Sequence, residues 1–176
     1  MNKKITALLL TSFLTLAGIG SAFAHAEFES ESAVANMHNT FVLGIPHGCE
    51  VANTTKVKIA IPSTLKEVMV MGVRQGKNSV KGWKIATEKS GGKLIVVASG
   101  PAVASTEEKQ LSISFMATTP KKVGSYLEFP TTQYCGSKVN RWVQPHPKDG
   151  SDPAEDAFPM PRVKLTLKSN TPAKGM

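Results

Sequence analysis

The sequence predicts an all-β protein that folds as an antiparallel β-sandwich. Short runs of β-favouring residues recur along the chain and are separated by Gly, Pro, Ser or Asn. Several of these runs alternate apolar and polar residues, as strands with one buried face do. After residue 24, no apolar stripe with the 3.6-residue period of a helix is sustained. Strands that follow one another without intervening helices favour a sandwich over a βαβ fold.

The clearest strand signal lies at residues 55–62, where Val57, Ile59 and Ile61 occupy one face and Lys56 and Lys58 occupy the other. We expect these three side chains to face the core. The glycine pair at residues 91–92 predicts a hairpin turn. The other expected strands cover residues 40–45, 68–73, 83–87, 93–98, 111–117, 126–129, 131–134, 141–143 and 163–167. Residues 145–161 are rich in proline, and we expect an ordered loop there.

Residues 1–24 have the pattern of a secretory signal peptide: two lysines, an apolar run at residues 5–20, and small residues that end at Ala24. The apolar run is short for a membrane span, and no later run approaches the roughly 20 residues that a spanning helix needs. We therefore expect cleavage after Ala24 and a periplasmic or secreted protein. Residues 25–176 then form a single domain without a transmembrane segment.

The positive charge of the chain does not indicate a nucleic-acid partner. The formal net charge is +8, and it falls to +6 when the two lysines of residues 1–24 are removed. The remaining lysines are scattered, without a dense block or interleaved aromatic residues. Export also separates the protein from nucleic acid. The charge is therefore interpreted as a contribution to solubility.

Cys49 and Cys135 are the only cysteines, and they are 86 residues apart. In an oxidising compartment we expect them to form a disulfide. Closing a loop of this length stabilises the fold by about 4 kcal/mol in the chain-entropy model. A thiolate copper ligand is the alternative, but it requires a reduced cysteine, and no Cys-x-x-Cys spacing supports it.

His25 becomes the first residue of the protein if cleavage follows Ala24. A free amine and an imidazole on one residue can close a chelate ring around a metal ion. Nitrogen and oxygen donors in a tetragonal arrangement favour Cu(II), which also has the highest affinity in the divalent series. Residues 25–29 alternate polar and apolar side chains, so an extended conformation would place His25 and Glu27 on the same face. His25 is therefore a candidate metal ligand.

His47 and Glu50 flank Cys49 and are candidate ligands near a rigid crosslink. Taken alone, each is more simply a solvated loop residue. Trp142 follows Cys135 closely, so the disulfide would bring it near this loop. Its indole could cover a bound cation, although core packing is the simpler interpretation.

Met69 and Met71 form a Met-x-Met pair in an apolar strand. Thioethers suit Cu(I), but the surrounding valines favour the interpretation that both side chains lie in the core. His38 and His146 are isolated loop histidines, and Trp83 is assigned to the core. No paired catalytic carboxylates, nucleophile elbow, phosphate loop or zinc spacing is recognisable, so we expect no enzyme.

Taken together, these residues resemble the YcnI-like family. The resemblance covers nearly all of the chain after residue 24. It rests on His25 followed by Pro46-His47-Gly48-Cys49-Glu50, Thr54-Thr55-Lys56-Val57, Ile61-Pro62, Gly82-Trp83, Leu127-Glu128-Phe129-Pro130, Gln133, Cys135, Arg141-Trp142 and Pro159-Met160-Pro161.

The resemblance implies an exported β-sandwich, cupredoxin-like or immunoglobulin-like, that binds one Cu(II). His25 would supply the amine and imidazole, Glu50 would supply a carboxylate, and Trp142 would cover the site. Whether His47 or the methionine pair joins the site stays open. The implied role is copper homeostasis or delivery, with other exported or membrane copper-handling proteins as partners. A non-metal envelope adhesion module and a copper-dependent oxidase, which needs a second histidine such as His47, are the alternatives.

Overall fold

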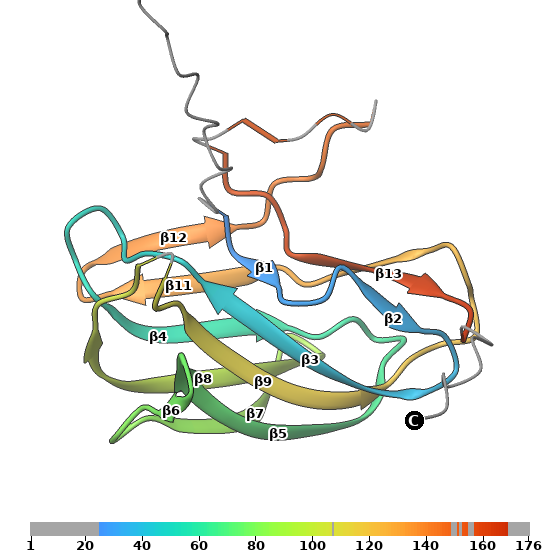
Figure 1. The fold of residues 1–176 in the computed structure, drawn as a ribbon, viewed down its shortest axis with the longest axis horizontal. Helices are drawn as coiled ribbons and strands as arrows, with labels where there is room; N and C mark the ends of the chain where they lie inside the picture. Colours follow the sequence, from blue (N-terminus) through green and yellow to red (C-terminus); the bar gives the residue numbers. More distant parts are fainter. Residues whose placement is uncertain (1–24, 107, 149–150, 152, 155–156, 169–176) are drawn as a thin grey trace, which may run out of the picture.

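The structure is a computed structural model that describes residues 25–106, 108–148, 151, 153–154 and 157–168 (Figure 1). The expected signal peptide, residues 1–24, lies outside the described residues. The described chain forms thirteen strands. It contains no helix with the length and apolar character needed to cross a membrane.

Two five-stranded sheets form a sandwich, and a three-stranded sheet accompanies them (Figure 1). The β3 sheet has the order β1 (Glu27–Phe28), β3 (His38–Ile45), β9 (Leu111–Thr118), β5 (Lys66–Gln75) and β6 (Asn78–Ser79). The β4 sheet has the order β12 (Lys138–Trp142), β11 (Thr131–Cys135), β4 (Thr54–Ala60), β8 (Lys93–Val103) and β7 (Lys84–Ser90). The β13 sheet has the order β10 (Tyr126–Glu128), β13 (Arg162–Thr166) and β2 (Ser32–Val34). The expected all-β, antiparallel sandwich is confirmed.

The core is built from every second side chain of the strands, namely those that face the other sheet. Val57 and Ile59 on β4 are completely buried, and Ile61 just after β4 is also buried, as predicted. On the facing sheet, the odd-numbered residues of β9 from Leu111 to Ala117 are buried in the same way. Four phenylalanines at the centre have ring centroids 4.7–6.4 Å apart: Phe28, Phe41, Phe115 and Phe129. Such aromatic contacts add to the free energy gained by burying the rings.

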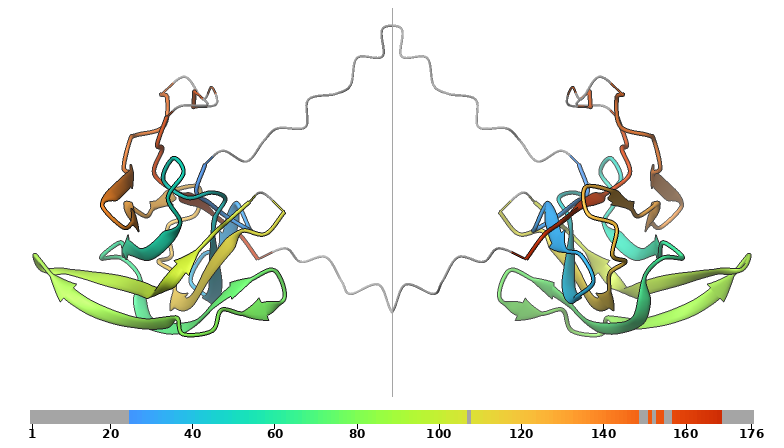
Figure 2. Two further views of the ribbon diagram at one scale, coloured as in Figure 1. Left: turned by 90° about the vertical axis from the view of Figure 1, so that its left-hand side faces the viewer. Right: turned by 90° about the vertical axis from the view of Figure 1, so that its right-hand side faces the viewer.

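The β7–β8 hairpin turns where the sequence predicts. Ser90 pairs with Lys93, and both glycines between them have positive φ values of 56° and 74°. Two successive left-handed residues define a type I′ turn, whose twist matches that of the strands. Seen from the side, this hairpin extends away from the body of the sandwich (Figure 2).

The structure corrects four details of the sequence analysis. Strand β2 was not expected, and it pairs in parallel with β13, whereas the other ladders between strands are antiparallel. Leu167 is 75% exposed because β13 ends at Thr166. Met69 and Met71 face solvent rather than the core.

Trp83 is only half-buried. It packs against the edge of the core, and its indole N–H donates a hydrogen bond to the Pro101 carbonyl at 2.9 Å.

The disulfide between Cys49 and Cys135 is present, with 5.8 Å between the Cα atoms. It ties the loop after β3 to the end of β11. A pair of hydrogen bonds between the backbones of Cys49 and Ala52 closes this loop on itself. The loop that carries His47 and Glu50 is therefore anchored to the β4 sheet.

Residues 143–161 connect β12 to β13, and those of them that the structure describes lie at the top of the molecule in Figure 1. Gln144 holds the two ends of this β12–β13 connection together. Its backbone N–H donates to the Phe158 carbonyl at 2.9 Å, and its side-chain oxygen accepts from the Phe158 N–H at 2.8 Å. Its carbonyl accepts from the Met160 N–H at 2.8 Å. The connection is thus fixed at its base, next to the start of the domain.

Candidate metal centre

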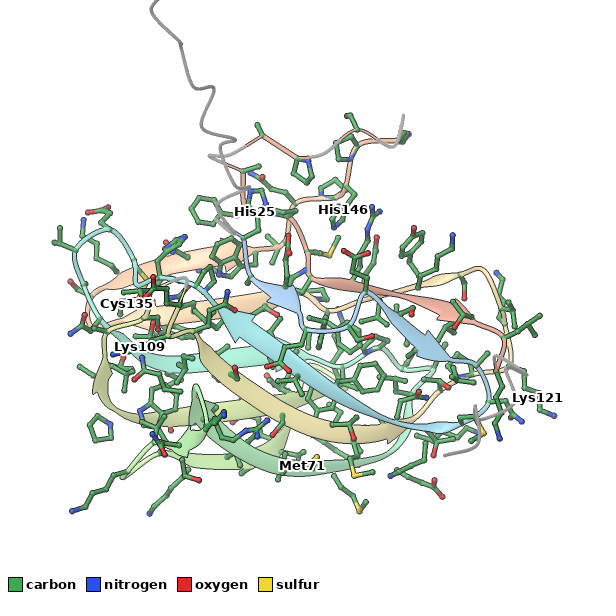
Figure 3. The ribbon with its side chains drawn as sticks, viewed as in Figure 1. His25, Met71, Lys109, Lys121, Cys135 and His146 are labelled. Carbon is green, nitrogen blue, oxygen red and sulfur yellow. A yellow bond between two sulfur atoms is a disulfide. The ribbon has the colours of Figure 1, made fainter. Side chains whose placement is uncertain are left out.

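His25 precedes β1 and is positioned by the burial of its neighbours. Ala26 and Phe28 point into the core, and β1 pairs with β3, with Phe28 opposite Leu43. The His25 ring is half-buried and lies beside the β12–β13 connection (Figure 3). Its Nε2 is 3.1 Å from the Ala154 carbonyl oxygen.

This contact sets the tautomer of the neutral His25 ring. A carbonyl oxygen only accepts hydrogen bonds, so the Nε2 atom must carry the hydrogen. The Nδ1 atom is then left with a free lone pair, and it has no hydrogen-bond partner in the described part of the chain. Nδ1 is also the ring nitrogen closest to the main-chain nitrogen of the same residue. In metal-binding histidines, a hydrogen bond from the ring nitrogen that does not bind the metal fixes the tautomer and the orientation of the ring in this way.

His47 and Trp142 are in direct ring contact, with centroids 5.9 Å apart. Trp142 is completely buried, and its ring also contacts Phe158 of the β12–β13 connection, with 4.9 Å between the ring centroids. His47 Nδ1 is 2.6 Å from the Gly48 carbonyl oxygen and therefore carries a hydrogen. Trp142 is thus a core residue whose ring also contacts the His47 ring.

Gln133 is the residue at this site that the sequence analysis underrated. Its completely buried amide donates to the His47 carbonyl at 2.7 Å and to the Thr54 hydroxyl at 2.8 Å. Its oxygen accepts from the Trp142 indole N–H at 3.1 Å. A buried polar side chain with three partners is a positioning element. Gln133 fixes His47 and Trp142 relative to one another.

Glu50 stands apart from these rings. It has a left-handed backbone with φ of 55°, and its side chain is 68% exposed. The carboxylate forms an ion pair with Lys138 at 3.1 Å. Among the described residues, no three His, Cys, Asp or Glu side chains form a group that could hold a metal ion. His25, His47 and Glu50 are therefore not gathered into one three-ligand cluster.

The β12–β13 connection links the separate parts. Ala154 contacts His25, while Phe158 packs on Trp142, which in turn contacts His47. The two histidines thus lie at opposite ends of one series of contacts. The structure joins them through this connection rather than through a shared cluster of ligands.

His146 is a second imidazole on the same connection, and sequence reasoning left it as an isolated loop residue. Its Nε2 is 2.7 Å from the Met160 carbonyl oxygen, so Nε2 carries the hydrogen. Its Nδ1 is buried and has no hydrogen-bond partner in the described part of the molecule. His25 and His146 therefore share one arrangement, in which a carbonyl of the connection accepts a hydrogen bond from Nε2–H and the Nδ1 atom keeps its lone pair. Both lie on the same side of the molecule (Figure 3).

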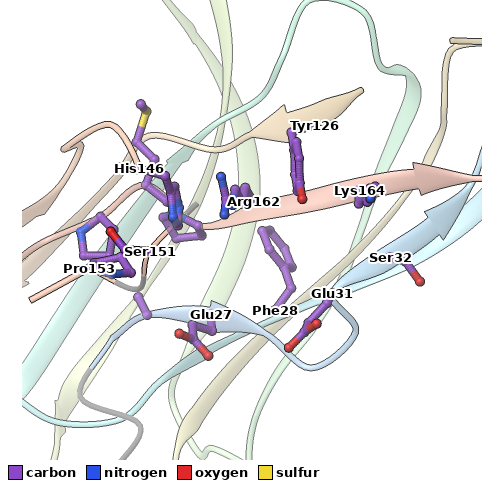
Figure 4. A pocket seen from close by; sticks show the side chains of 14 residues that line it. Glu27, Phe28, Glu31, Ser32, Tyr126, His146, Ser151, Pro153, Arg162 and Lys164 are labelled. Atoms are coloured by element: carbon purple, nitrogen blue, oxygen red, sulfur yellow. The ribbon is translucent and has the colours of Figure 1, made fainter. Parts of the chain in front are cut away.

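His146 lines a pocket of about 380 Å³ between β1, β13 and the connection (Figure 4). Ala26 and Glu27, the residues directly after His25, line the same pocket. Arg162 lies over the Tyr126 ring on the β13 side, at 4.4 Å from the ring centroid. The pocket thus combines carboxylate, imidazole and cationic side chains next to the start of β1.

Residues 25–165 match a protein family described as a domain of unknown function (DUF1775). The chain belongs to the DUF1775 family. The family match begins at His25 and includes every residue of the site described above. No curated protein matches the chain.

The DUF1775 chain is similar in fold to an uncharacterized protein from Nocardia farcinica with an immunoglobulin-like fold. The two are 18% identical with a TM-score of 0.61, and the match covers 82% of this chain and 99% of the other. A cohesin module from Clostridium perfringens is 10% identical, with a TM-score of 0.45 over 82% of this chain and 97% of its own. The sixth cohesin of scaffoldin B from Acetivibrio cellulolyticus is 12% identical, with a TM-score of 0.43 over 80% and 97%. The similarity to the Nocardia farcinica protein shows that the sandwich is immunoglobulin-like.

Proposed function

We propose that this DUF1775 protein is exported and binds one Cu(II) through His25 after cleavage at Ala24, in copper homeostasis or delivery and without catalysis of its own. The observation that carries the proposal is the contact between His25 Nε2 and the Ala154 carbonyl. It fixes the ring in the tautomer whose Nδ1 can bind a metal together with the amine. Cleavage would create the second donor, because the nitrogen of His25 is otherwise part of a peptide bond.

The chemistry of the two donors favours Cu(II). The amine and Nδ1 of one residue would occupy adjacent coordination positions, and nitrogen donors in such an arrangement suit Cu(II) above the other common divalent ions. The ring is already oriented by Ala154, so little further ordering would accompany binding. The burial of Ala26 and Phe28 holds the backbone at this point.

The remaining ligands of the proposal come from the family resemblance. The resemblance assigns Glu50 as the carboxylate ligand, although the described structure does not gather it into one cluster with His25 and His47. The ion pair of Glu50 with Lys138 is exposed and contributes less than about 1 kcal/mol, so a metal ion could displace the lysine. Trp142 would shield the site, with His47 held against its ring by Gln133. Partners that donate or receive copper would be other exported or membrane proteins.

The proposal is tested by Cu(II) titration of the protein that begins at His25, followed by electron paramagnetic resonance. We expect one bound Cu(II) with nitrogen coupling. One glycine added before His25 moves the free amine, and His25→Ala removes the imidazole; each should weaken binding at least tenfold. His38→Ala is the matched control, because His38 is exposed on β3 and bonded to Thr118. It should leave binding unchanged.

Equal affinity with and without the added glycine would overturn the proposal. An absent Cu(II) signal in all of these proteins would favour the adhesion module. Reductant-driven consumption of peroxide that depends on both His25 and His47 would replace the proposal with the oxidase. Mass spectrometry of the secreted protein checks the premise, because its first residue should be His25.

A further inference from the structure

Three methionines share the outer face of the β3 sheet, away from the His25 site. Met69 and Met71 on β5 are 53% and 54% exposed, while the valines that alternate with them pack against the core. Met116 on β9 pairs directly with Met69. It faces outward because its neighbours Phe115 and Ala117 are buried. Met71 and His25 lie on opposite sides of the view in Figure 3.

The register brings the three thioethers within reach of one another. Directly opposed residues of an antiparallel pair have Cβ atoms about 4.5–5.5 Å apart, which applies to Met69 and Met116. Residues two apart on one strand are separated by roughly 7 Å, which applies to Met69 and Met71. The register of β5 shifts between Val70 and Gly72, so Met71 occupies an irregular position. Gly72 has no side chain, and no atom lies within 4 Å of where its Cβ would be.

The side chains themselves suit a soft ligand. Methionine has three rotatable bonds and a polarisable sulfur, so neighbouring thioethers can converge without movement of the backbone. Thioethers bind Cu(I) and similar soft ions in preference to hard divalent cations. Both cysteines of the chain are consumed by the disulfide, so no thiolate competes for such an ion.

We propose that Met69, Met71 and Met116 form a second metal site that binds one soft monovalent ion, Cu(I) or Ag(I), on the outer face of the β3 sheet. This site needs neither the free amine nor the ring of His25. It therefore stands independently of the Cu(II) proposal. The uncharged thioethers also keep their donor electrons at acidic pH, unlike an amine or an imidazole.

Silver ion tests this site without a redox step. The protein with a glycine before His25 is titrated with Ag(I) in chloride-free buffer, and the methionine methyl groups are followed by carbon-13 NMR. We expect one Ag(I) to bind, with shifts confined to Met69, Met71 and Met116. Affinity at pH 5 should equal that at pH 7.

The triple variant Met69→Leu, Met71→Leu and Met116→Leu should bind Ag(I) at least tenfold more weakly. Leucine conserves volume, and two of the three positions are exposed, so the fold should survive. The matched control is Met37→Leu, which removes a single methionine that is 43% exposed just before β3. It should leave Ag(I) binding unchanged. Equal binding by the triple variant, or shifts at the other methionines instead, would overturn the site whatever the outcome at His25.

Discussion

The indole N–H of Trp142 donates to the side-chain oxygen of Gln133 at 3.1 Å, and both side chains are completely buried. The amide of the same glutamine donates to the His47 carbonyl and to Thr54. One side chain thus satisfies the polar groups of a core residue and of a loop residue. The position of the His47 loop therefore depends on the core.

Replacing Gln133 with leucine should lower the free energy of unfolding by about 2–4 kcal/mol. The indole N–H and the His47 carbonyl would lose their partner, and each unsatisfied buried group costs about 1–3 kcal/mol. Urea denaturation followed by tryptophan fluorescence measures the change. Gln75→Leu is the matched control, because the side chain of Gln75 donates to two carbonyls near the surface that water can satisfy. A loss no greater than that of the control would contradict the role of Gln133.

Gly48 should not tolerate a side chain. A Cβ at this position would overlap the backbone carbonyl oxygen of Ala52, on the opposite side of the loop that follows β3. We expect Gly48→Ala to destabilise the protein by about 1–3 kcal/mol, as overpacking does. Gly72→Ala is the control, since nothing lies within 4 Å of its Cβ. The melting temperatures of the two variants are measured by thermal unfolding, and that of Gly48→Ala should be the lower. Equal melting temperatures would contradict the close approach of Gly48 to Ala52.

Cu(II) binding at His25 should weaken steeply in acid. The metal must displace protons from the α-amine and the imidazole, because both groups bind a metal ion only in their deprotonated form. Lowering the pH from 7.5 to 5 should therefore reduce the affinity by roughly a hundredfold or more. Competition titrations at several pH values measure this. An affinity that does not change with pH would show that Cu(II) binds at a site whose ligands do not bind protons in this range.

The Lys58–Glu88 ion pair provides a pH-dependent contribution to stability. A hydrogen bond at 2.8 Å from Lys58 to Glu88 raises the pKa of the Lys58 ammonium above its ordinary value of 10.5, although partial burial opposes this. A raised pKa means that the contribution is fully present below pH 10.5 and is lost as the pH rises through the raised pKa. Because both side chains are still accessible to solvent, at 35% and 44% exposure, the contribution should stay below about 0.5 kcal/mol.

Glu88→Gln tests the pair by urea denaturation at pH values from 8 to above 11. Its stability difference from the unmodified protein should be constant at first and should disappear at the alkaline end. Glu128→Gln, at an exposed position on β10, is the control, and its stability difference from the unmodified protein should not change with pH in this range. A difference that grows with pH would have the wrong sign for this ion pair.

The parts of the fold that could be predicted are those where period-two alternation is unambiguous. Val57, Ile59 and Ile61 occupy every second position, with Lys56 and Lys58 on the other face, and the sequence analysis placed these three residues in the core correctly. In contrast, Val-Met-Val-Met at residues 68–71 is apolar on both faces, so the pattern contains no information about which face is buried. Only the pairing of β5 with β9 decides it. Strand β2 has three residues, too few for a period.

The candidate site was predictable only where it depends on local chemistry. His25 stands out because of the sequence before it, and the disulfide brings the loop of His47 close to β11. The tautomers of His25 and His146 depend on carbonyls far along the chain, which no local pattern reveals. The same holds for Gln133, whose three partners come together only in the folded protein.

The parallel pairing of β2 with β13 joins the two ends of the chain, with Ser32 beside Lys164. Strand β13 also pairs with β10, so it is the central strand of its sheet. During synthesis, β2 can pair with β13 only after almost all of the described chain has been made. Contacts of such long sequence separation form late and slowly. The β13 sheet can therefore be completed only after residues 162–166 have been synthesised, however early the residues of β2 leave the ribosome.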